Sequence, residues 1–258
     1  MGIALTDRHD FSITQSLQRG LPDAQHKLAG CWLDAPHELA GGAGCGISLA
    51  ALDRALAELD LAAILPAALA RAVRKRQLSF LGGRLCAERA LVELGYPNGA
   101  VGRAESGVPL WPDGLVGSIT HHGEAAYAVA AFSSDYAALG MDSERLARPS
   151  AAQSIRSLCC TEREIQAWLG QRDDNVAETL IFSAKEAGYK AIHPLLGRFV
   201  DFTEFEVQAL DWQAGCLTLA PTGKSGLLGR MRPFRVRFRC AGAEVHTIVA
   251  ERGSLFVA

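Results

Sequence analysis

The sequence lacks the features that mark membrane-spanning, secreted and nucleic-acid-binding proteins. No apolar stretch approaches the length of a membrane span, and the charged residues 7–10 stand where a signal peptide needs an apolar run. The 26 basic and 28 acidic residues leave a net charge of −2, which gives no general electrostatic case for binding nucleic acid or an anionic membrane. We therefore expect a soluble, cytoplasmic protein in which any anion-binding site is local.

The sequence also lacks the cysteine spacings that mark zinc sites and disulfide frameworks. The seven cysteines are scattered and odd in number, and no two form a Cys-x-x-Cys pair, so the sequence indicates neither a zinc site nor a disulfide framework. We expect reduced, mostly buried thiols. With 49% hydrophobic and 21% charged residues, the 258-residue chain can build a substantial core.

A clear dinucleotide-binding motif is missing from the first 46 residues, although they end in a glycine-rich cluster at 41–46. The spacing G-x-G-x-x-G would need a third glycine where Ile47 stands, and no clear strand precedes the cluster. We therefore interpret residues 41–46 as a loop.

What is present is a hydrophobic pattern typical of an α+β protein. Helices are predicted at 48–59, 66–94, 161–169 and 176–192, and strands at 115–122, 125–132, 136–141, 202–207, 216–219, 234–238 and 245–249. Asp174 or Asn175 can cap the last helix, and Pro194 lies just past its end. We predict two similar α/β halves, residues 1–138 and 139–258, each with a principal helix packed on a small, mainly antiparallel sheet.

Three carboxylates and a lysine in the second half have the spacing of a cation site. Asp142 and Glu144 end a predicted strand, where residues two apart point to the same side. Glu186 and Lys190 are four residues apart on a predicted helix and share a face. A surface salt bridge would explain the helix pair alone. Three carboxylates together suit Mg²⁺, and a lysine beside them suggests a phosphate as the second ligand.

Cations in the first half offer another place for an anionic ligand. Arg76 and Arg84 are eight residues apart on the predicted helix 66–94, so they project roughly 80° apart. Gly82 and Gly83 remove side-chain bulk between them, which would let a flat ligand lie between the two cations. A solvated face is the alternative interpretation for the other basic residues of this helix.

Ser118, Thr120 and His121 lie where the predicted strand 115–122 ends. Strand ends that carry glycine and hydroxyl residues are suited to hold phosphate oxygens. A lone histidine at such a position is more often a turn residue than a ligand, so the segment alone leaves both interpretations open.

Five motifs, taken together, resemble one family. In chain order they are GRLCAERAL at 83–91, PLWPDG at 109–114, GSITH at 117–121, GMDSE at 140–144 and FSAKE at 182–186 followed by Lys190. They resemble the 4′-phosphopantetheinyl transferases of the surfactin and enterobactin synthetase type, over residues 74–205. The fold implied by this resemblance is two similar α/β halves, related by a pseudo-twofold axis, with the active site between them.

The resemblance implies an enzyme that moves the phosphopantetheine arm of coenzyme A to a serine of an acyl or peptidyl carrier protein and releases adenosine 3′,5′-bisphosphate. It implies Mg²⁺ ligands at Asp142, Glu144 and Glu186, and catalytic roles for Glu186, Asp142, Lys190 and His121. The residues implied to bind coenzyme A are Lys75, Arg76, Arg84, Ser106, Gly107, Val108, Pro109, Leu110, Trp111, Ser118, Ile119, Thr120, His121, Asp142, Lys185, Glu186 and Lys190.

Within that set, the resemblance gives each group a part of coenzyme A. Lys190 is implied to meet the pyrophosphate, and Ser118 and His121 the phosphate oxygens. Arg84, with Lys75 or Arg76, is implied to meet the 3′-phosphate, and residues 106–111 are implied to line the adenine. Cations suit this reaction because breaking a pyrophosphate bond develops negative charge on oxygen. Glu186 or a metal-bound water would accept the serine proton.

The sequence departs from the family pattern at two positions. Met141 stands where an aliphatic residue is usual, which should be neutral because methionine packs similarly. Gly188 replaces a larger apolar residue in the helix that carries Lys190, which costs about 1 kcal/mol of helix propensity. We expect this glycine to loosen the placement of Lys190.

Two other functions stay open from the sequence. A catalytically idle module that binds coenzyme A or a carrier protein would keep Arg84 and His121 without needing three carboxylates. A magnesium-dependent nucleotide pyrophosphatase could use the same acids and cations. We expect a monomer with a local basic patch for an acidic carrier protein, formed by Lys185, Arg198 and either Lys224 or Arg230. Ordinary solvated cations are the alternative interpretation of these residues.

Overall fold

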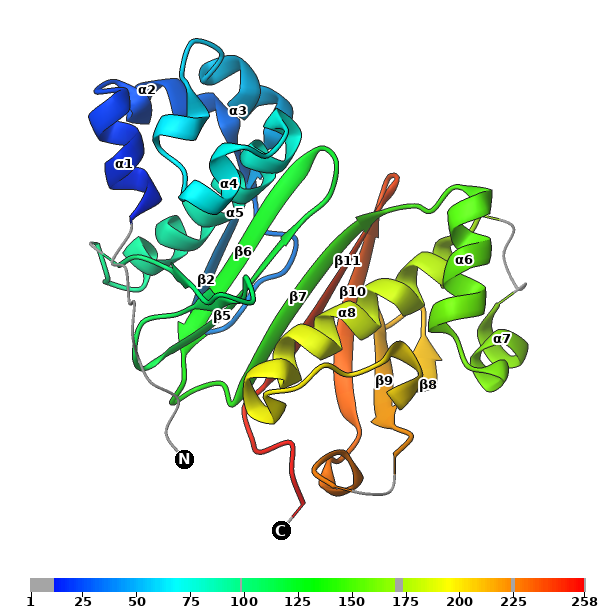
Figure 1. Ribbon diagram of the computed structural model, residues 1–258. Coiled ribbons are helices and arrows are strands. Elements are labelled where there is room, and N and C mark those ends of the chain that lie inside the picture. The colour runs from blue at the N-terminus through cyan, green and yellow to red at the C-terminus, as the bar shows by residue number, and fades with distance from the viewer. Residues whose placement is uncertain (1–11, 98, 170–173, 224–225, 258) are drawn as a thin grey trace. The chain divides into compact units, whose positions relative to one another are not determined.

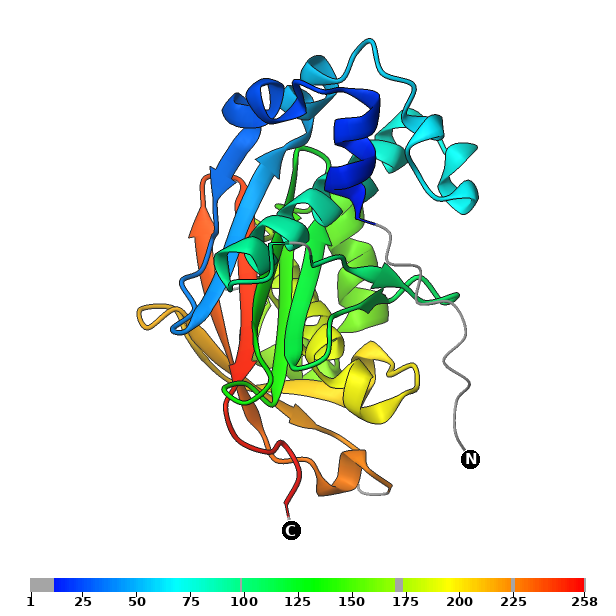
Figure 2. The same cartoon turned by 90° about the vertical axis from the view of Figure 1, so that its left-hand side faces the viewer.

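The computed structural model describes residues 12–97, 99–169, 174–223 and 226–257. The chain divides into two compact units, Met1–Ile119 with Gly123–Ala131 and Thr120–His122 with Phe132–Ala258. Helices and antiparallel sheets occur in both units, which confirms the predicted α+β class (Figure 1 and Figure 2). The pseudo-twofold relation and the boundary between residues 138 and 139 stay predictions.

The first unit is built on a four-stranded sheet and a long helix. In hydrogen-bonding order, the strands are β1 (Trp32–Asp34), β2 (Gly42–Ser48), β6 (Ala125–Phe132) and β5 (Leu115–His121), and the last residues of β5 and β6, from Thr120 and at Phe132, belong to the second unit. The helices are α1 (Ile13–Gly20), α2 (Ala24–Leu28), α3 (Leu49–Ala55), α4 (Ala67–Ala70) and α5 (Arg74–Glu93), and β3 (Gly102–Arg103) pairs with β4 (Pro109–Leu110). The predicted helix 66–94 is therefore two helices, and Gly95 follows the second in the left-handed conformation, φ 89°.

The glycine cluster at 41–46 is not a loop, so that prediction is wrong. Residues 42–48 form β2, the strand on which α5 packs. A side chain at position 46 would overlap the Tyr127 ring, and a Cβ at position 44 would lie 2.9 Å from Cγ1 of Val129. These glycines make room for the side chains of the neighbouring strand β6.

Gly82 and Gly83 serve packing inside the first unit as well. A Cβ at position 82 would lie 2.8 Å from Cδ2 of Leu49, and one at position 83 would lie 2.7 Å from Cγ2 of Ile119. Both glycines are buried, so the space that they leave is filled by core side chains. The prediction that they open a slot for a flat ligand is wrong.

The second unit is a five-stranded antiparallel sheet with α8 lying along one face (Figure 1). The strand order is β7 (Ala138–Arg145), β11 (Glu244–Glu251), β10 (Phe234–Ala241), β9 (Cys216–Pro221) and β8 (Phe205–Asp211). The helices are α6 (Pro149–Cys159), α7 (Glu162–Trp168) and α8 (Val176–Leu196). Its core includes Leu180, Ile181 and Ala184 of α8 and Phe234 and Val236 of β10.

One detail of α8 differs from the sequence-based expectations: Pro194 lies inside the helix rather than past its end. Gly188 faces the sheet, where a Cβ would lie 3.1 Å from Cδ1 of the buried Leu219. Its effect on the placement of Lys190 stays a prediction. At the start of α8, the side chain of Asn175 makes no capping hydrogen bond, whereas Asp174 Oδ1 accepts one from Val176 N at 3.3 Å.

The thiol groups agree with the expectation from the sequence. All seven cysteines are free, and five of them are buried. Among the residues that the structure describes, none of the helices combines the length and apolar character needed to cross a bilayer.

Candidate active site

Gly140 brings β7 and α8 into direct contact. A Cβ at this position would overlap the carbonyl oxygen of Ala187 and crowd the backbone of Ala191, so only glycine fits this approach without movement of the helix. Asp142 follows two residues later and therefore points to the same face of the sheet, toward α8. The close approach explains how Lys190 of α8 reaches Asp142, with 2.6 Å between Nζ and Oδ1.

The two oxygens of Asp142 have different surroundings. Oδ1 accepts hydrogen bonds from Lys190 Nζ at 2.6 Å and from Thr120 Oγ1 at 3.0 Å. Oδ2 is buried, as is the residue as a whole at 2% exposed, and it has no hydrogen-bond partner among the residues that the structure describes. A buried carboxylate oxygen without a partner is costly, so Oδ2 marks a place where a cation or donor would be stabilising.

The pKa values of Glu144 and Glu186 are raised in these surroundings. Burial raises the pKa of the Glu144 carboxyl to about 7, and the charges of Asp142 and Glu186 add to that rise while Lys190 opposes it. Burial also raises the pKa of Glu186, against the effect of Lys190. The single ammonium of Lys190 therefore does not balance the three acids.

The carboxylates are not assembled into a finished metal site. In the described part of the chain, no group of three or more His, Cys, Asp or Glu side chains is arranged to hold a metal ion. The predicted Mg²⁺ ligands therefore stay a prediction. The unpartnered Oδ2 of Asp142 and the raised pKa values of Glu144 and Glu186 nevertheless fit a cation. A positive charge there would interact favourably with Oδ2 and would lower both pKa values.

Apolar hollows border two of these acids. One of about 60 Å³ lies beside Glu186 and Tyr189 and is lined by Phe199 and Phe202. A larger one of about 470 Å³ includes Glu144 and the apolar side chains Ile155, Leu158 and Phe182. The acidic cluster thus lies next to surfaces that suit an aliphatic group.

The structure corrects the prediction that Lys185 belongs to a basic surface patch. Its ammonium is enclosed, at 2.7 Å from both Oε2 of Glu164 and the carbonyl oxygen of Cys159. Glu164 also accepts hydrogen bonds from Val207 N at 2.7 Å and, in the capping box of α7, from Thr161 N at 2.8 Å. Lys185 is 3% exposed, so its place in a surface patch for carrier proteins was predicted wrongly, and its ammonium is already engaged within the fold.

The other predicted carrier-binding cations are only partly described. Arg198 is exposed and forms a two-pronged ion pair with Glu204, at 3.0 Å for each contact. Arg230 is exposed at the end of a short 3-10 helix. Lys224 lies outside the described residues. A basic surface for carrier proteins stays a prediction.

Arg84, the predicted partner of the 3′-phosphate, lies in the first unit and is 6% exposed. Its Nη1 donates to the carbonyl oxygens of Val101 and Gly102, both at 2.8 Å, and its guanidinium lies 5.2 Å from the centre of the Phe80 ring. Burial lowers the pKa of Arg84 to about 10, which still leaves it charged at neutral pH. The guanidinium therefore ties α5 to the segment that leads into β3.

The remaining predicted contacts are placed as follows. Lys75 and Arg76 are exposed on the first turn of α5. Residues 106–111 lie on the ribbon of β3 and β4, and the Trp111 ring covers Gly117, where a side chain would overlap it. Ser118 and Thr120 are buried, whereas His121 is exposed at the end of β5. That these groups share one ligand with the acidic cluster stays a prediction.

Sequence reasoning missed one hydrogen bond and two longer polar contacts near Asp142. Ser143 Oγ lies 2.6 Å from Nδ1 of His246, and Nε2 of His246 lies 3.4 Å from Glu244, whose other oxygen lies 3.4 Å from Nε2 of His122. The signal was weak because polar residues in an edge strand usually face solvent. Here Ser143 and His246 are opposite each other in the register of β7 and β11, and both are buried.

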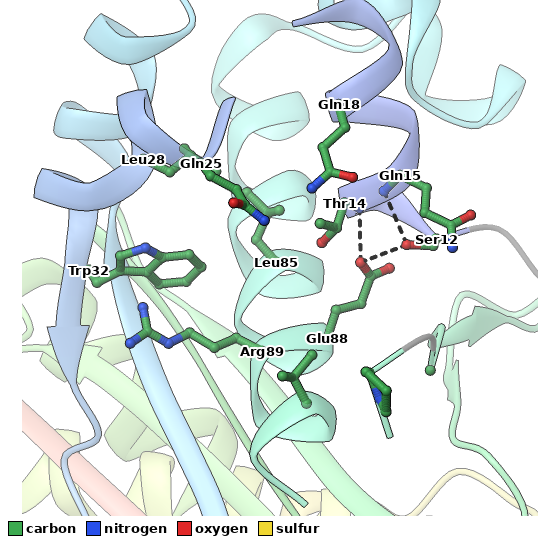
Figure 3. Close-up of a pocket in the computed structure, with 13 residues that line it drawn as sticks. Ser12, Thr14, Gln15, Gln18, Gln25, Leu28, Trp32, Leu85, Glu88 and Arg89 are labelled. Atoms are coloured by element: carbon green, nitrogen blue, oxygen red, sulfur yellow. Dashed lines mark hydrogen bonds between the residues drawn. The ribbon is translucent and has the colours of Figure 1, made fainter. Parts of the chain in front are cut away.

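It also missed a pocket of about 550 Å³ in the first unit (Figure 3). Glu88 of α5 projects into it and accepts hydrogen bonds from Ser12 Oγ, Ile13 N and Thr14 N, which fastens the start of α1. On the opposite side, the guanidinium of Arg89 stacks on Trp32 at 4.3 Å. No motif in the sequence indicated this pocket, because its walls come from α1, α2, β1 and α5.

Two family models match the chain. The 4′-phosphopantetheinyl transferase N-terminal domain matches residues 65–131, and the 4′-phosphopantetheinyl transferase superfamily matches residues 138–249. Among solved structures, a holo-[acyl-carrier-protein] synthase of Thermotoga maritima is 18% identical, with a TM-score of 0.36 over 46% of this chain and 65% of that chain.

Several curated relatives match in sequence. The 4′-phosphopantetheinyl transferase Svp of Streptomyces mobaraensis is 39% identical over 70% of this chain and 74% of its own length. Npt of Nocardia iowensis is 40% identical over 54% of this chain and 62% of its own length. Enterobactin synthase component D of Escherichia coli is 37% identical over 48% of this chain and 59% of its own length. The chain thus spans between about three fifths and three quarters of these relatives.

Proposed function

This chain belongs to the 4′-phosphopantetheinyl transferase family, and we propose that it transfers the 4′-phosphopantetheine arm of coenzyme A to a serine of an acyl or peptidyl carrier protein. Adenosine 3′,5′-bisphosphate would be the second product. The observation that carries the proposal is the ion pair between Lys190 and Asp142, beside Glu144 and Glu186 whose pKa values are raised, because these are the groups that the family resemblance assigns to the metal and the pyrophosphate.

In this proposal Mg²⁺ is held by Asp142, Glu144 and Glu186. The fit is supported by the unpartnered Oδ2 of Asp142 and by the uncompensated charge at the two glutamates. When bound, the cation would neutralise the acids and draw negative charge from the pyrophosphate oxygens. Lys190 would orient the pyrophosphate, since its ammonium is fixed by Asp142 at one edge and keeps two further N–H donors.

The remaining roles follow from position. Glu186 would accept the proton of the carrier serine as that hydroxyl attacks phosphorus. Arg84, with Lys75 or Arg76, would bind the 3′-phosphate, and residues 106–111 would line the adenine. The larger apolar hollow beside Glu144 supports an aliphatic arm in this region, because its walls include Ile155 and Leu158.

The test is a mass measurement on an apo carrier protein incubated with this protein, coenzyme A and Mg²⁺. The expected result is a mass increase of one phosphopantetheine, which disappears when the carrier serine is replaced by alanine. Omitting Mg²⁺ or substituting Asp142→Ala should abolish most of the transfer. Cleavage of coenzyme A without a carrier would favour a pyrophosphatase, and binding without cleavage would favour an idle binding module. Either result would overturn the proposal.

Some finer points belong to the same proposal. The protein would act as a monomer on acidic carrier domains, with Arg198 and Arg230 as surface contacts. The two units would correspond to the pseudo-symmetric halves of the family, which is supported by the presence of one long helix against an antiparallel sheet in each, α5 and α8.

A further inference from the structure

Thr120 makes a pair of hydrogen bonds that the sequence did not indicate. Its side chain is buried at the end of β5, and the residue is 3% exposed. Oγ1 donates to Oδ1 of Asp142 at 3.0 Å and accepts from Ser143 N at 3.2 Å. The direction is fixed because a backbone N–H can only donate, which leaves the hydroxyl hydrogen for the carboxylate.

These bonds determine which oxygen of Asp142 is left over. Thr120 and Lys190 both engage Oδ1, whereas Oδ2 is buried and has no hydrogen-bond partner in the described parts of the chain. A partial rotation of the carboxylate would break both contacts, and a half-turn only exchanges two equivalent oxygens. One oxygen is therefore always held in the second, buried position, where none of the described groups of the protein satisfies it.

The backbone at Ser143 is itself held in place, by strand pairing and by the side chain of Ser143. The hydroxyl of Ser143 lies 2.6 Å from Nδ1 of His246, its neighbour across β7 and β11. The Ser143 N–H is thus fixed by the sheet, and it fixes the hydroxyl of Thr120 in turn. In metal sites generally, the residues that orient a metal ligand hydrogen-bond to that ligand on one side and to the rest of the fold on the other. Thr120 has the same arrangement toward Asp142.

We propose that Thr120 is a positioning residue for Asp142, which it holds so that Oδ2 faces a divalent cation. The inference rests on the proposed function in one respect: the cation is taken to be the one that takes part in phosphopantetheine transfer. It differs from the role that the family resemblance implied, because there the Thr120 segment meets the phosphates of coenzyme A. The hydroxyl cannot donate to a phosphate while it donates to Asp142, since it carries a single hydrogen.

The experiment separates metal binding from substrate binding. Mn²⁺ is titrated into the free protein and followed by electron paramagnetic resonance, and the KM for coenzyme A is measured separately in the transfer assay. Thr120→Val removes both hydrogen bonds at nearly constant volume, and Thr120→Ser keeps the hydroxyl. We expect Thr120→Val to raise the Kd for Mn²⁺ by roughly 10- to 100-fold. Thr120→Ser should stay near the parent, and the KM for coenzyme A should change little in either variant.

Thr247→Val is the matched control. Thr247 is the neighbour of Asp142 across β7 and β11, is fully buried, and also makes two hydrogen bonds, to Ser183 Oγ and to the Ser183 carbonyl, both at 2.9 Å. Both of these hydrogen bonds go to Ser183 and neither goes to Asp142. We expect its loss to lower the unfolding temperature while the Kd for Mn²⁺ stays within a few-fold of the parent.

Three outcomes would overturn the inference: no Mn²⁺ binding by the parent, equal weakening in Thr120→Val and Thr247→Val, or a raised KM for coenzyme A in Thr120→Val with an unchanged Kd for Mn²⁺. The last would assign Thr120 to the substrate. Should Thr120→Val fail to fold, Thr120→Ala and Thr120→Ser provide the same comparison. A parent that binds Mn²⁺ in a Thr120-dependent way without transferring phosphopantetheine would refute the proposed function and leave this inference standing.

Discussion

Replacing Lys185 by methionine tests whether its ammonium belongs to the fold or to the substrate. Its side chain is 1% exposed and that of Glu164 is 0% exposed, with 2.7 Å between Nζ and Oε2. Lys185→Met keeps the length of the side chain but removes the charge, so the carboxylate of Glu164 would be left buried without its counter-ion. Breaking a buried pair in this way costs about 3–5 kcal/mol.

The expected loss is large enough for a thermal melt. For a protein of this size, each kcal/mol corresponds to roughly 2–4 °C, so Lys185→Met should unfold about 6–20 °C below the parent. The double variant Lys185→Met with Glu164→Gln should recover much of the loss, because the glutamine side chain is neutral and its amide oxygen can still accept from Val207 N. Circular dichroism melts of the parent, the two single variants and the double variant give the coupling energy directly.

An exposed ion pair provides the control for this measurement. Lys27 and Asp23 are one turn apart on the surface, 3.6 Å from each other, with side chains 36% and 57% exposed. Lys27→Met should change stability by less than about 1 kcal/mol. The reasoning about Lys185 would be refuted if Lys185→Met melted like the parent while its KM for coenzyme A rose. That pattern would assign the ammonium to the substrate, as the family resemblance implied.

Three further predictions follow from the same contacts. Because burial raises the pKa of Glu144 from 4.5 to about 7, the folded state holds this proton more tightly than the unfolded chain, so stability should fall as the pH rises from about 4.5 to 7. Thermal melts of Glu144→Gln should lack this part of the pH dependence. Gly140→Ala should lose roughly 1–3 kcal/mol or more in a urea titration, because the new Cβ meets the backbone of α8. Arg84→Ala should raise the KM for coenzyme A by roughly 10- to 100-fold, from about 1.5–3 kcal/mol for a charged hydrogen bond, and should discriminate less against dephospho-coenzyme A.

Spacing rules predicted the parts of the structure that depend on local geometry. Arg235, Arg237 and Arg239 alternate along β10 with buried apolar residues, and all three side chains are exposed, as a two-residue period requires. The two-residue period predicts Asp142 and Glu144 on one side of β7, and the helical period predicts Glu186 and Lys190 on one face of α8; the charge interactions among these residues agree with both. These features follow from the backbone repeat of a single element, so the sequence alone suffices.

The failures share a different cause. Lys185 looked like a surface cation because nothing in its own helix indicates Glu164, which approaches from α7, 21 residues earlier. The cluster at 41–46 looked like a loop because glycine weakens a strand in isolation, whereas here the Tyr127 side chain fills the space above Gly46. In both cases the deciding partner comes from another element, and propensity carries no information about it.

The acidic cluster shows how packing and chemistry depend on each other. Gly140 allows α8 to lie against β7, which draws Lys190 to Asp142, and the same closeness removes water from Glu144 and Glu186. With three acids and one lysine, the ionised cluster carries two uncompensated negative charges in a partly buried place, which disfavours the folded state. A bound divalent cation would remove that penalty only in the folded protein, so the electrostatic free energy that packing has raised becomes binding free energy for the cation. A looser contact between β7 and α8 would hydrate the acids and stabilise the free protein, but it would weaken the attraction for the cation at the same time.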